Sequence, residues 1–339
     1  MTSATVEDLF INPRIITRAK IRGYVSLCSI LRASQSELQQ KLALTAADVE
    51  QLTTAAANYI LPQKLSAWEM QNTDQERFLH ITTGCHQLDD FLGGGIPVRG
   101  LTEVTGESGS GKTQLVLQLA LYAQLPPISG GLGKGVAYIC TESQFSSNRL
   151  QQLISHIRNK YPKGPKSYTD NIFVHHVPDM DNLVDCVRYQ LPHLISSRHV
   201  GLVVIDSVAA PFRVEDRRER NTTLLLQTLG YRLHQLTSSH NIAVVAINQV
   251  TAAMGKQSLY GLEGNTAPAL GLSWANLVTT RLMLTRTHSF VRTHKLLPQT
   301  TVEFNIRKLE VVFCPWLRRK SFSFIVTEKG IEDIAMSTV

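Results

Sequence analysis

Residues 106–113 read Gly-Glu-Ser-Gly-Ser-Gly-Lys-Thr, and their types and spacing suit the binding of nucleotide phosphates. They form a complete G-x-x-x-x-G-K-T pattern, in which glycines allow unusual backbone angles and bring amide groups close to an anion. In such a loop Lys112 neutralises the β- and γ-phosphates, and the hydroxyl of Thr113 is placed to bind Mg²⁺. The residues predicted to bind the nucleotide are Gly106, Glu107, Ser108, Gly109, Ser110, Gly111, Lys112 and Thr113.

The residues on either side of this loop supply the order of elements that phosphate binding requires. Residues 101–105 alternate in the manner of a buried strand. After the loop, Leu115, Leu119 and Tyr122 recur at helical spacing. A chance glycine-rich turn is the alternative, but it would have no reason to join a strand to a helix. We therefore interpret the loop as a site for a nucleoside triphosphate.

Polar side chains end three other predicted strands and could complete the site. Asp206 follows the apolar run 202–205 and could hold the Mg²⁺ shell, although such an acid can also be a helix cap. Glu142 ends another strand and could activate the water that attacks the γ-phosphate, or be a plain surface carboxylate. Gln249, after Asn248, could sense the γ-phosphate or simply terminate its strand.

From residue 81 onward, apolar strands alternate with helical patterns. The predicted strands are residues 136–140, 172–176, 202–206 and 242–247. Between the last two, Leu225, Leu229, Leu233 and Leu236 mark an amphipathic helix. Continuous apolar strands separated by helices predict an α/β fold with a mostly parallel sheet covered on both faces. From Val302 to Ile334 we expect β-hairpins with a turn near Pro315.

The N-terminal part has a different pattern, which predicts a small helical domain. Ser34 with Glu37, and Thr45 with Asp48, match capping boxes at helix starts. The stretch that follows is polar and contains Pro62, which is typical of a linker. The chain is therefore predicted to divide into a helical domain at 1–60, a linker or assembly segment at 61–80, and a core with C-terminal hairpins at 81–339.

Composition places the chain in a broad class. With 339 residues, 43% of them apolar, it can bury a sizeable core, and its formal charge of +7 is compatible with a nucleic-acid partner. Five cysteines without a C-x-x-C pair favour reduced thiols inside a cell over disulfides or a zinc site. We see no signal-peptide pattern and no apolar run near the roughly 20 residues that span a bilayer, so we expect a soluble intracellular protein.

Taken together, these motifs resemble the RecA-type strand-exchange recombinases of eukaryotes and their paralogues, over almost the whole chain. Further stretches carry the resemblance: 83–89, 93–97, 100–103, 138–142, 149–150, 202–207, 248–250, 268–271 and 274–276. The runs 11–16, 204–213 and 247–251 are most similar to one paralogue, an accessory factor in homologous recombination. The resemblance implies a RecA-like P-loop ATPase core.

The resemblance also implies a role for each matching residue, with ATP and Mg²⁺ as cofactors. Lys112 and Thr113 bind the phosphates and the metal, and Asp206 takes the second metal position. Glu142 takes the place of the catalytic carboxylate. Gln249 takes the γ-phosphate-sensing place.

The resemblance also gives roles to two more residues, one of which belongs to a contact between subunits. By the same resemblance, Arg149 stacks on the adenine and Pro268 caps ATP from an adjoining subunit. The implied partners are another recombinase paralogue as heterodimer, the main strand-exchange recombinase, and single-stranded or branched DNA, with no membrane. The implied location is the nucleus, with some protein in the cytoplasm.

The DNA-facing parts depart from the family's pattern. The N-terminal hairpin that usually carries glycines corresponds to residues 41–45, which have none. The first DNA-facing loop, about 214–221, mixes arginines with acids, and the second, about 251–266, offers only Lys256 and Tyr260 for phosphate contact and stacking. An intact nucleotide site beside weakened DNA loops favours an accessory subunit with slow ATP hydrolysis. The alternatives are an autonomous strand-exchange recombinase that forms homofilaments and, less favoured, a small-molecule kinase.

Two basic stretches could still contact DNA or form solvated faces. Residues 264–302 contain no acid and carry Arg281, Arg286, Arg292 and Lys295, and residues 316–320 form a basic tip with an aromatic residue.

The linker suggests how subunits join. In the family, a large apolar residue followed three positions later by Ala docks on the next subunit. Here Ala67 is kept but Lys64 stands at the anchor position, which leaves Leu65 and Trp68 as the apolar residues. This favours selective contact with a different paralogue, unless Trp68 folds back onto its own domain.

Overall fold

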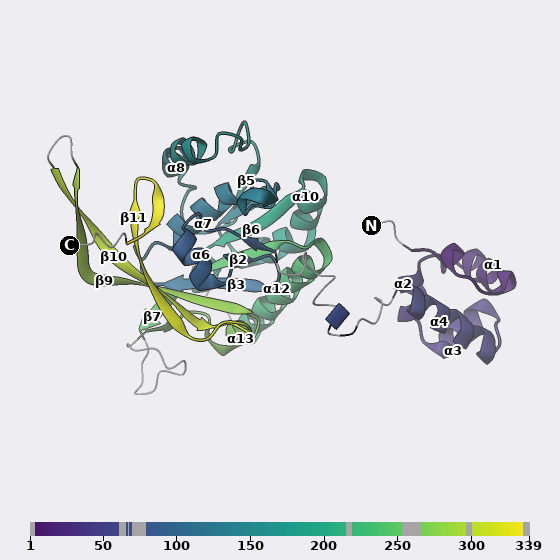
Figure 1. Cartoon of the computed structure of the whole chain (residues 1–339). Helices are drawn as coiled ribbons and strands as arrows, with labels where there is room; N and C mark the ends of the chain where they lie inside the picture. The colour runs from purple at the N-terminus through teal and green to yellow at the C-terminus, as the bar shows by residue number, and fades with distance from the viewer. Residues whose placement is uncertain are drawn as a thin grey trace. The chain divides into compact units, whose positions relative to one another are not determined.

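The computed structural model of the chain describes residues 4–60, 66, 68–69, 79–214, 219–252, 266–295 and 300–334. The chain divides into two compact units, Met1–Asp74 and Gln75–Val339 (Figure 1). None of the helices in the described ranges combines the length and apolarity needed to cross a bilayer.

The first unit is helical and has its own core. Its elements are η1 (Val6–Asp8), α1 (Pro13–Ile21), α2 (Leu27–Arg32), α3 (Gln35–Leu42) and α4 (Ala46–Ile60). Each contributes fully buried apolar side chains, among them Val6, Ile15, Leu27, Leu38 and Leu52. Both predicted helix starts are present. The Thr45 N–H donates to Asp48 and the Asp48 N–H to the Thr45 hydroxyl, each at 3.2 Å, so this capping box is complete.

A large sheet forms the centre of the second unit (Figure 1). Its strands are β3 (Leu101–Gly106), β4 (Gly135–Cys140), β5 (Ile172–His176), β6 (Val200–Asp206), β7 (Ala243–Ala252), β9 (Thr280–Lys295), β10 (Thr300–Phe313), β11 (Lys320–Thr327) and β12 (Gly330–Asp333). They lie in the order β12-β11-β10-β9-β3-β7-β6-β4-β5. Strands β5, β4, β6, β7, β3 and β9 pair in parallel, and β9 to β12 pair antiparallel. Short β8 (Thr266–Pro268) pairs with β7, and β1 (His80–Ile81) pairs with β2 (Ile96–Pro97).

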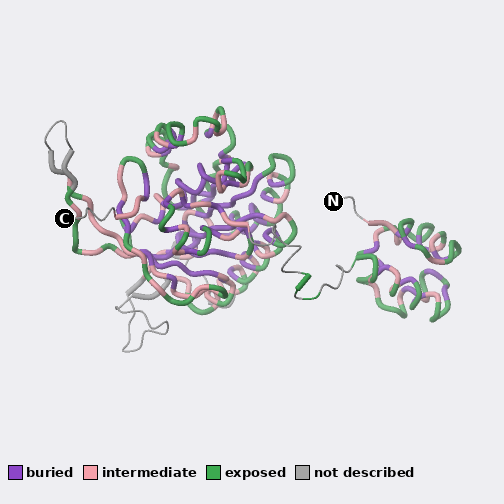
Figure 2. The backbone as a smooth tube through the Cα atoms, viewed as in Figure 1, coloured by how far each residue is buried: buried purple, intermediate pink, exposed green. Residues whose placement is uncertain are grey.

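Helices cover both faces of this sheet, as its apolar strands predict. They are α6 (His86–Leu92), α7 (Lys112–Tyr122), η3 (Pro127–Ser129), α8 (Ser147–Lys160), α9 (Met180–Asp185), η4 (Cys186–Gln190), α10 (Leu191–Arg198), α11 (Ala210–Val214), α12 (Glu219–His240) and α13 (Gly271–Ala275). Alternate residues of β6 enter different cores. Val204 packs with α7 and α8, whereas Val203 and Ile205 pack with α9 to α12. Figure 2 shows the buried strands between these two layers.

The predicted α/β fold with a mostly parallel sheet is confirmed, and one long strand was missed. The antiparallel part begins at β9, before the Val302 at which hairpins were expected. Strand β9 lacks a clear apolar pattern, because Arg281 lies in its buried segment and more basic residues follow. The charge of Arg281 is compensated by Glu103 of β3, a contact between distant positions that sequence periodicity does not reveal.

Candidate nucleotide-binding site

The phosphate loop joins the carboxyl end of β3 to the first residue of α7, Lys112. Gly109 and Gly111 adopt φ angles of 74° and 107°, which favour glycine. Gly106 is required for a further reason, since a Cβ there would lie 2.1 Å from the carbonyl oxygen of Leu284. The loop backbone therefore lies directly against β9 and opens a helix N-terminus, a geometry that suits an anion.

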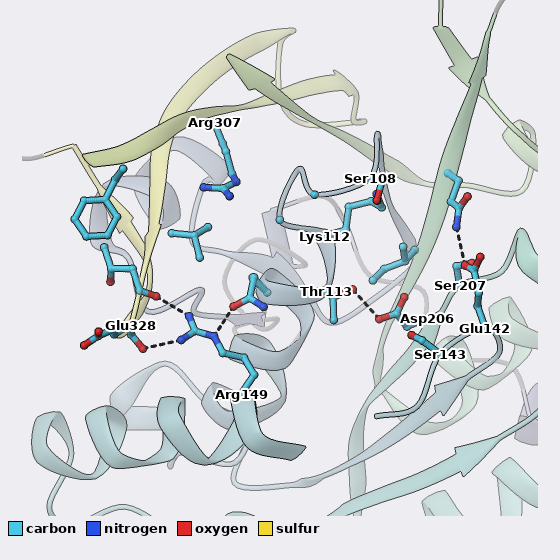
Figure 3. A pocket seen from close by; sticks show the side chains of 18 residues that line it. Ser108, Lys112, Thr113, Glu142, Ser143, Arg149, Asp206, Ser207, Arg307 and Glu328 are labelled. Atoms are coloured by element: carbon cyan, nitrogen blue, oxygen red, sulfur yellow. Dashed lines mark hydrogen bonds between the residues drawn. The ribbon is translucent and has the colours of Figure 1, made fainter. Parts of the chain in front are cut away.

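A pocket of about 870 Å³ lies over this loop (Figure 3). It brings together most of the predicted site: Ser108, Gly109, Gly111, Lys112, Thr113, Glu142, Arg149, Asp206 and Gln249. These side chains come from the ends of different parallel strands and the helices after them, as expected for the carboxyl edge of an α/β sheet. Gly106, Glu107 and Ser110 belong to the loop itself; the Ser110 hydroxyl is buried and has no hydrogen-bond partner within the described part of the chain.

Lys112 is buried within the loop that it serves. Its Nζ donates to the carbonyl oxygens of Gly106 and Glu107, both at 2.7 Å. Burial lowers the pKa of Lys112, and the charges of Asp206, Glu107 and Glu142 oppose that shift. The ammonium group is thus held beside the loop's amides, where a phosphate would give it a stronger acceptor than two carbonyl groups.

Thr113 and Asp206 form the predicted metal position. The Thr113 hydroxyl donates to Asp206 Oδ2 at 3.1 Å, and the Tyr138 hydroxyl donates to the same oxygen at 2.8 Å. Burial raises the pKa of Asp206, while the bonds from Tyr138 and Thr113 and the charge of Lys112 lower it. A hydroxyl and a carboxylate are hard oxygen ligands, which fit Mg²⁺. No group of three or more His, Cys, Asp or Glu that could hold a metal occurs in the described residues, so the rest of a Mg²⁺ shell would come from phosphate oxygens and water.

Glu142 and Gln249 meet at the edge of the pocket. The Gln249 amide donates to Glu142 Oε2 at 2.7 Å, which joins β7 to the segment that follows β4 (Figure 3). Asn248, the neighbour of Gln249, is buried and donates to Glu103 instead, at 2.7 Å. Successive side chains of a strand point to opposite faces, so of these two amides only Gln249 faces the pocket.

Arg149 lies at the other end of the pocket, where it connects α8 to the C-terminal hairpin. Its guanidinium donates to Gln114 at 2.6 Å, to the Thr327 carbonyl at 2.6 Å and to the Glu328 carbonyl at 3.0 Å. Hydrogen bonds lie in the plane of a guanidinium, so they fix its orientation and do not use its faces. This orientation is compatible with the predicted stacking on adenine.

Several predicted contacts lie outside the described residues. Pro268 pairs with Val250 in β8, but its side chain is not described, so its capping role stays a prediction. The same holds for most of the second DNA-facing loop, for residues 215–218 of the first, and for Leu65 of the linker.

The structure corrects the interpretation of the basic stretch 264–302. Arg281 is completely buried and forms an ion pair with Glu103, so it belongs to neither a DNA-binding nor a solvated face. Arg292 is exposed but pairs with Glu303 at 2.8 Å. At the basic tip, Arg319 pairs with Glu310 at 2.6 Å. The positive charges of these three arginines are therefore already compensated within the chain.

Sequence reasoning missed the pocket wall contributed by the C-terminal hairpins. It consists of Phe304, Arg307, Val326, Thr327 and Glu328. These residues form no motif, and only the antiparallel pairing of β9, β10 and β11 brings them beside the phosphate loop. The sequence signal for this wall was Arg307, an arginine in a β-rich segment for which no role was predicted.

Comparisons with known proteins agree with this architecture. The sequence model of the Rad51 family matches residues 74–334. DNA repair protein XRCC3 of Mus musculus is 38% identical over 343 residues, which cover 96% of this chain and 97% of that protein. The XRCC3 of Bos taurus is 37% identical over the same length, with the same coverage. DNA repair protein rhp57 of Schizosaccharomyces pombe is 30% identical over 346 residues, 91% of this chain and 96% of that protein.

Proposed function

The chain belongs to the Rad51 family, and we propose that it is an ATP-binding accessory subunit of a homologous-recombination DNA repair complex. In this role it supports assembly of the recombinase on DNA and strand exchange, and it hydrolyses ATP weakly. The pocket over the phosphate loop is the observation that carries the proposal, since it gathers Lys112, Asp206, Glu142 and Gln249. The relatives named DNA repair proteins, similar over nearly the whole chain, support the repair role.

Rad51-family proteins are generally ATPases that bind ATP with Mg²⁺, and this chain has residues for each task. The loop amides and Lys112 bind the phosphates. Thr113 and Asp206 would hold Mg²⁺, which neutralises phosphate charge when bound. Glu142 accepts a proton from the attacking water, and Gln249, bonded to its carboxylate at 2.7 Å, fixes that carboxylate's position.

The proposed partners are another Rad51 paralogue, the main recombinase, and single-stranded or branched DNA, in the nucleus with some protein in the cytoplasm. A surface suited to a protein partner lies at β5, the last strand in the order of the described sheet. Beside it is a pocket of about 560 Å³ whose lining includes Ile139, Phe173 and Leu194. Tyr189, which also lines this pocket, is 60% exposed. An edge strand beside apolar side chains favours docking of an extended segment.

Electron microscopy on single-stranded DNA tests the accessory role against the alternative of an autonomous strand-exchange recombinase. We expect no regular filaments from the purified chain with ATP, and co-purification of a second paralogue from cells. Long regular filaments of this protein alone would favour the autonomous recombinase. Binding of Mg–ATP is required by both functions and is measured separately.

A further inference from the structure

Two arginines, Arg286 of β9 and Arg307 of β10, lie directly opposite each other in the antiparallel ladder. Like charges in this position repel and destabilise a sheet. Arg307 lies in a partly buried place, and its pKa is lowered by burial and by the charge of Arg286. Guanidinium groups nevertheless stay charged at neutral pH. The pair therefore concentrates two positive charges at one point of the sheet.

Three other arginines of the antiparallel strands and their tip are compensated by acids. Arg281 pairs with Glu103, Arg292 with Glu303 and Arg319 with Glu310. Within the described residues, neither Arg286 nor Arg307 has a carboxylate within ion-pair distance of its guanidinium. Moreover, Arg307 Nε is buried there without a hydrogen-bond partner.

Both arginines face the phosphate loop of the same chain. The point where a Cβ of Gly109 would lie is 3.6 Å from Arg286 Nη1. The corresponding point at Gly111 is 3.4 Å from Arg307 Cδ and 3.7 Å from its Nε. Glycine at these two positions leaves the loop backbone directly against the arginine side chains. The Glu107 carboxylate accepts the backbone N–H of Arg286 at 3.0 Å, which ties β9 to the loop.

We propose that Arg286 and Arg307 form a phosphate-binding pair for the nucleotide held by the loop of their own chain. Arg307 lines the pocket, and Figure 3 shows it on the other side of the phosphate loop from Asp206 and Glu142. A polyphosphate on the loop's amides would then be bounded by Lys112 and the metal position on one side and by the arginines on the other. Its negative charge removes the repulsion between the two guanidinium groups. The inference rests on the proposed nucleotide binding and deepens it, because this chain itself supplies the positive charge at the C-terminal wall.

The test is calorimetric titration of the full-length chain with Mg–ATP and, separately, with inorganic tripolyphosphate. Arg307→Gln and Arg286→Gln should each weaken both ligands by roughly tenfold or more, as expected for lost charge-assisted hydrogen bonds. The matched control is Arg292→Gln, which removes the same charge from the same hairpin and should change affinity less than about twofold. The ligand-free melting temperature of each pair variant should be unchanged or raised, because repulsion is relieved.

The outcomes separate this inference from the function on which it rests. If the wild type binds Mg–ATP and Lys112→Ala loses it, but the arginine variants bind as well as the control, the pair is not a phosphate site and the proposed function stands. If the wild type binds no nucleotide, both fail. Loss of single-stranded DNA affinity with unchanged ATP affinity would assign the arginines to DNA and overturn the inference. If Arg307→Gln does not fold, the result is decided by two other variants. These are Arg286→Gln, whose position is exposed, and Arg307→Lys.

Discussion

Lys112 is the residue on which nucleotide binding depends most directly. Replacement by alanine removes the charge that meets the phosphates, and charge-assisted hydrogen bonds contribute about 1.5–3 kcal/mol each. We therefore expect Lys112→Ala to weaken ATP binding by roughly tenfold or more and to reduce the rise in melting temperature caused by Mg–ATP. Lys163→Ala, at an exposed position, is the control. An unchanged ATP-induced shift in the Lys112 variant would refute the assignment.

Glu142 is the proposed general base of ATP hydrolysis. Its contact with Gln249 suggests a variant that removes the base and keeps the shape of the site. Glutamine at position 142 can still accept the hydrogen bond from the Gln249 amide, so the shape of the site is kept while the base is lost. We expect Glu142→Gln to bind ATP normally and to reduce turnover by about 10²-fold or more. Steady-state phosphate release measures this. If the wild-type rate persists in the variant, the base lies elsewhere in the complex.

At the scale of single residues, the sequence predicted those parts of the pocket for which a sequence motif and the order of strands and helices led to the same conclusion. The phosphate loop, Asp206 and Glu142 end or follow strands that run in one direction, and the carboxyl ends of parallel strands share one edge. Arg307 could not be predicted, because its place depends on the register of an antiparallel strand that the sequence does not fix. The same holds for Asn248 and Gln249. Adjacent residues of a strand point to opposite faces, and the sequence does not show which of the two amides faces the pocket.

At the scale of elements, a buried polar cluster joins the strands beneath the site. Glu103 of β3 pairs with Arg281 of β9 and accepts from Asn248 of β7 and Trp274 of α13, at 2.7 and 2.9 Å. Sequence patterns identify strands by their apolar residues, so they predicted β3 and β7 but missed β9, whose buried arginine interrupts the pattern. The cluster is visible only when the strand order is known.

This cluster predicts a large effect of a conservative change. Glu103→Gln keeps the shape of the side chain but leaves the Arg281 charge buried without its carboxylate, which typically costs about 3–5 kcal/mol. The matched control is Glu303→Gln, which breaks the exposed pair with Arg292 and should cost no more than about 1 kcal/mol. Urea denaturation of both variants measures the difference. Equal small losses would show that the buried pair does not stabilise the core.

At the scale of the whole molecule, the linker between the helical unit and the core is the proposed assembly element. Ser66 and Glu69 form a reciprocal capping box, with the Ser66 N–H bonded to Glu69 at 2.7 Å and the Glu69 N–H to Ser66 at 3.2 Å. Trp68, between these two residues in the sequence, is 73% exposed. Large exposed aromatic side chains are typical anchors of protein interfaces.

We therefore expect Leu65→Glu combined with Trp68→Ala to abolish co-purification with a recombinase paralogue. Burial of a tryptophan of this kind contributes on the order of 2–3 kcal/mol to an interface, and a charge at position 65 opposes docking in an apolar groove. The ATPase core should stay folded, which retained Mg–ATP binding would verify, because position 68 belongs to the unit Met1–Asp74 and not to the core. Exposed Tyr59→Ala in the same unit is the control for a general loss of apolar surface. If the double variant still recovers its partner at wild-type yield, the linker is not the assembly element. The interface must then lie on the core, where the edge of the sheet at β5 is the next surface to vary.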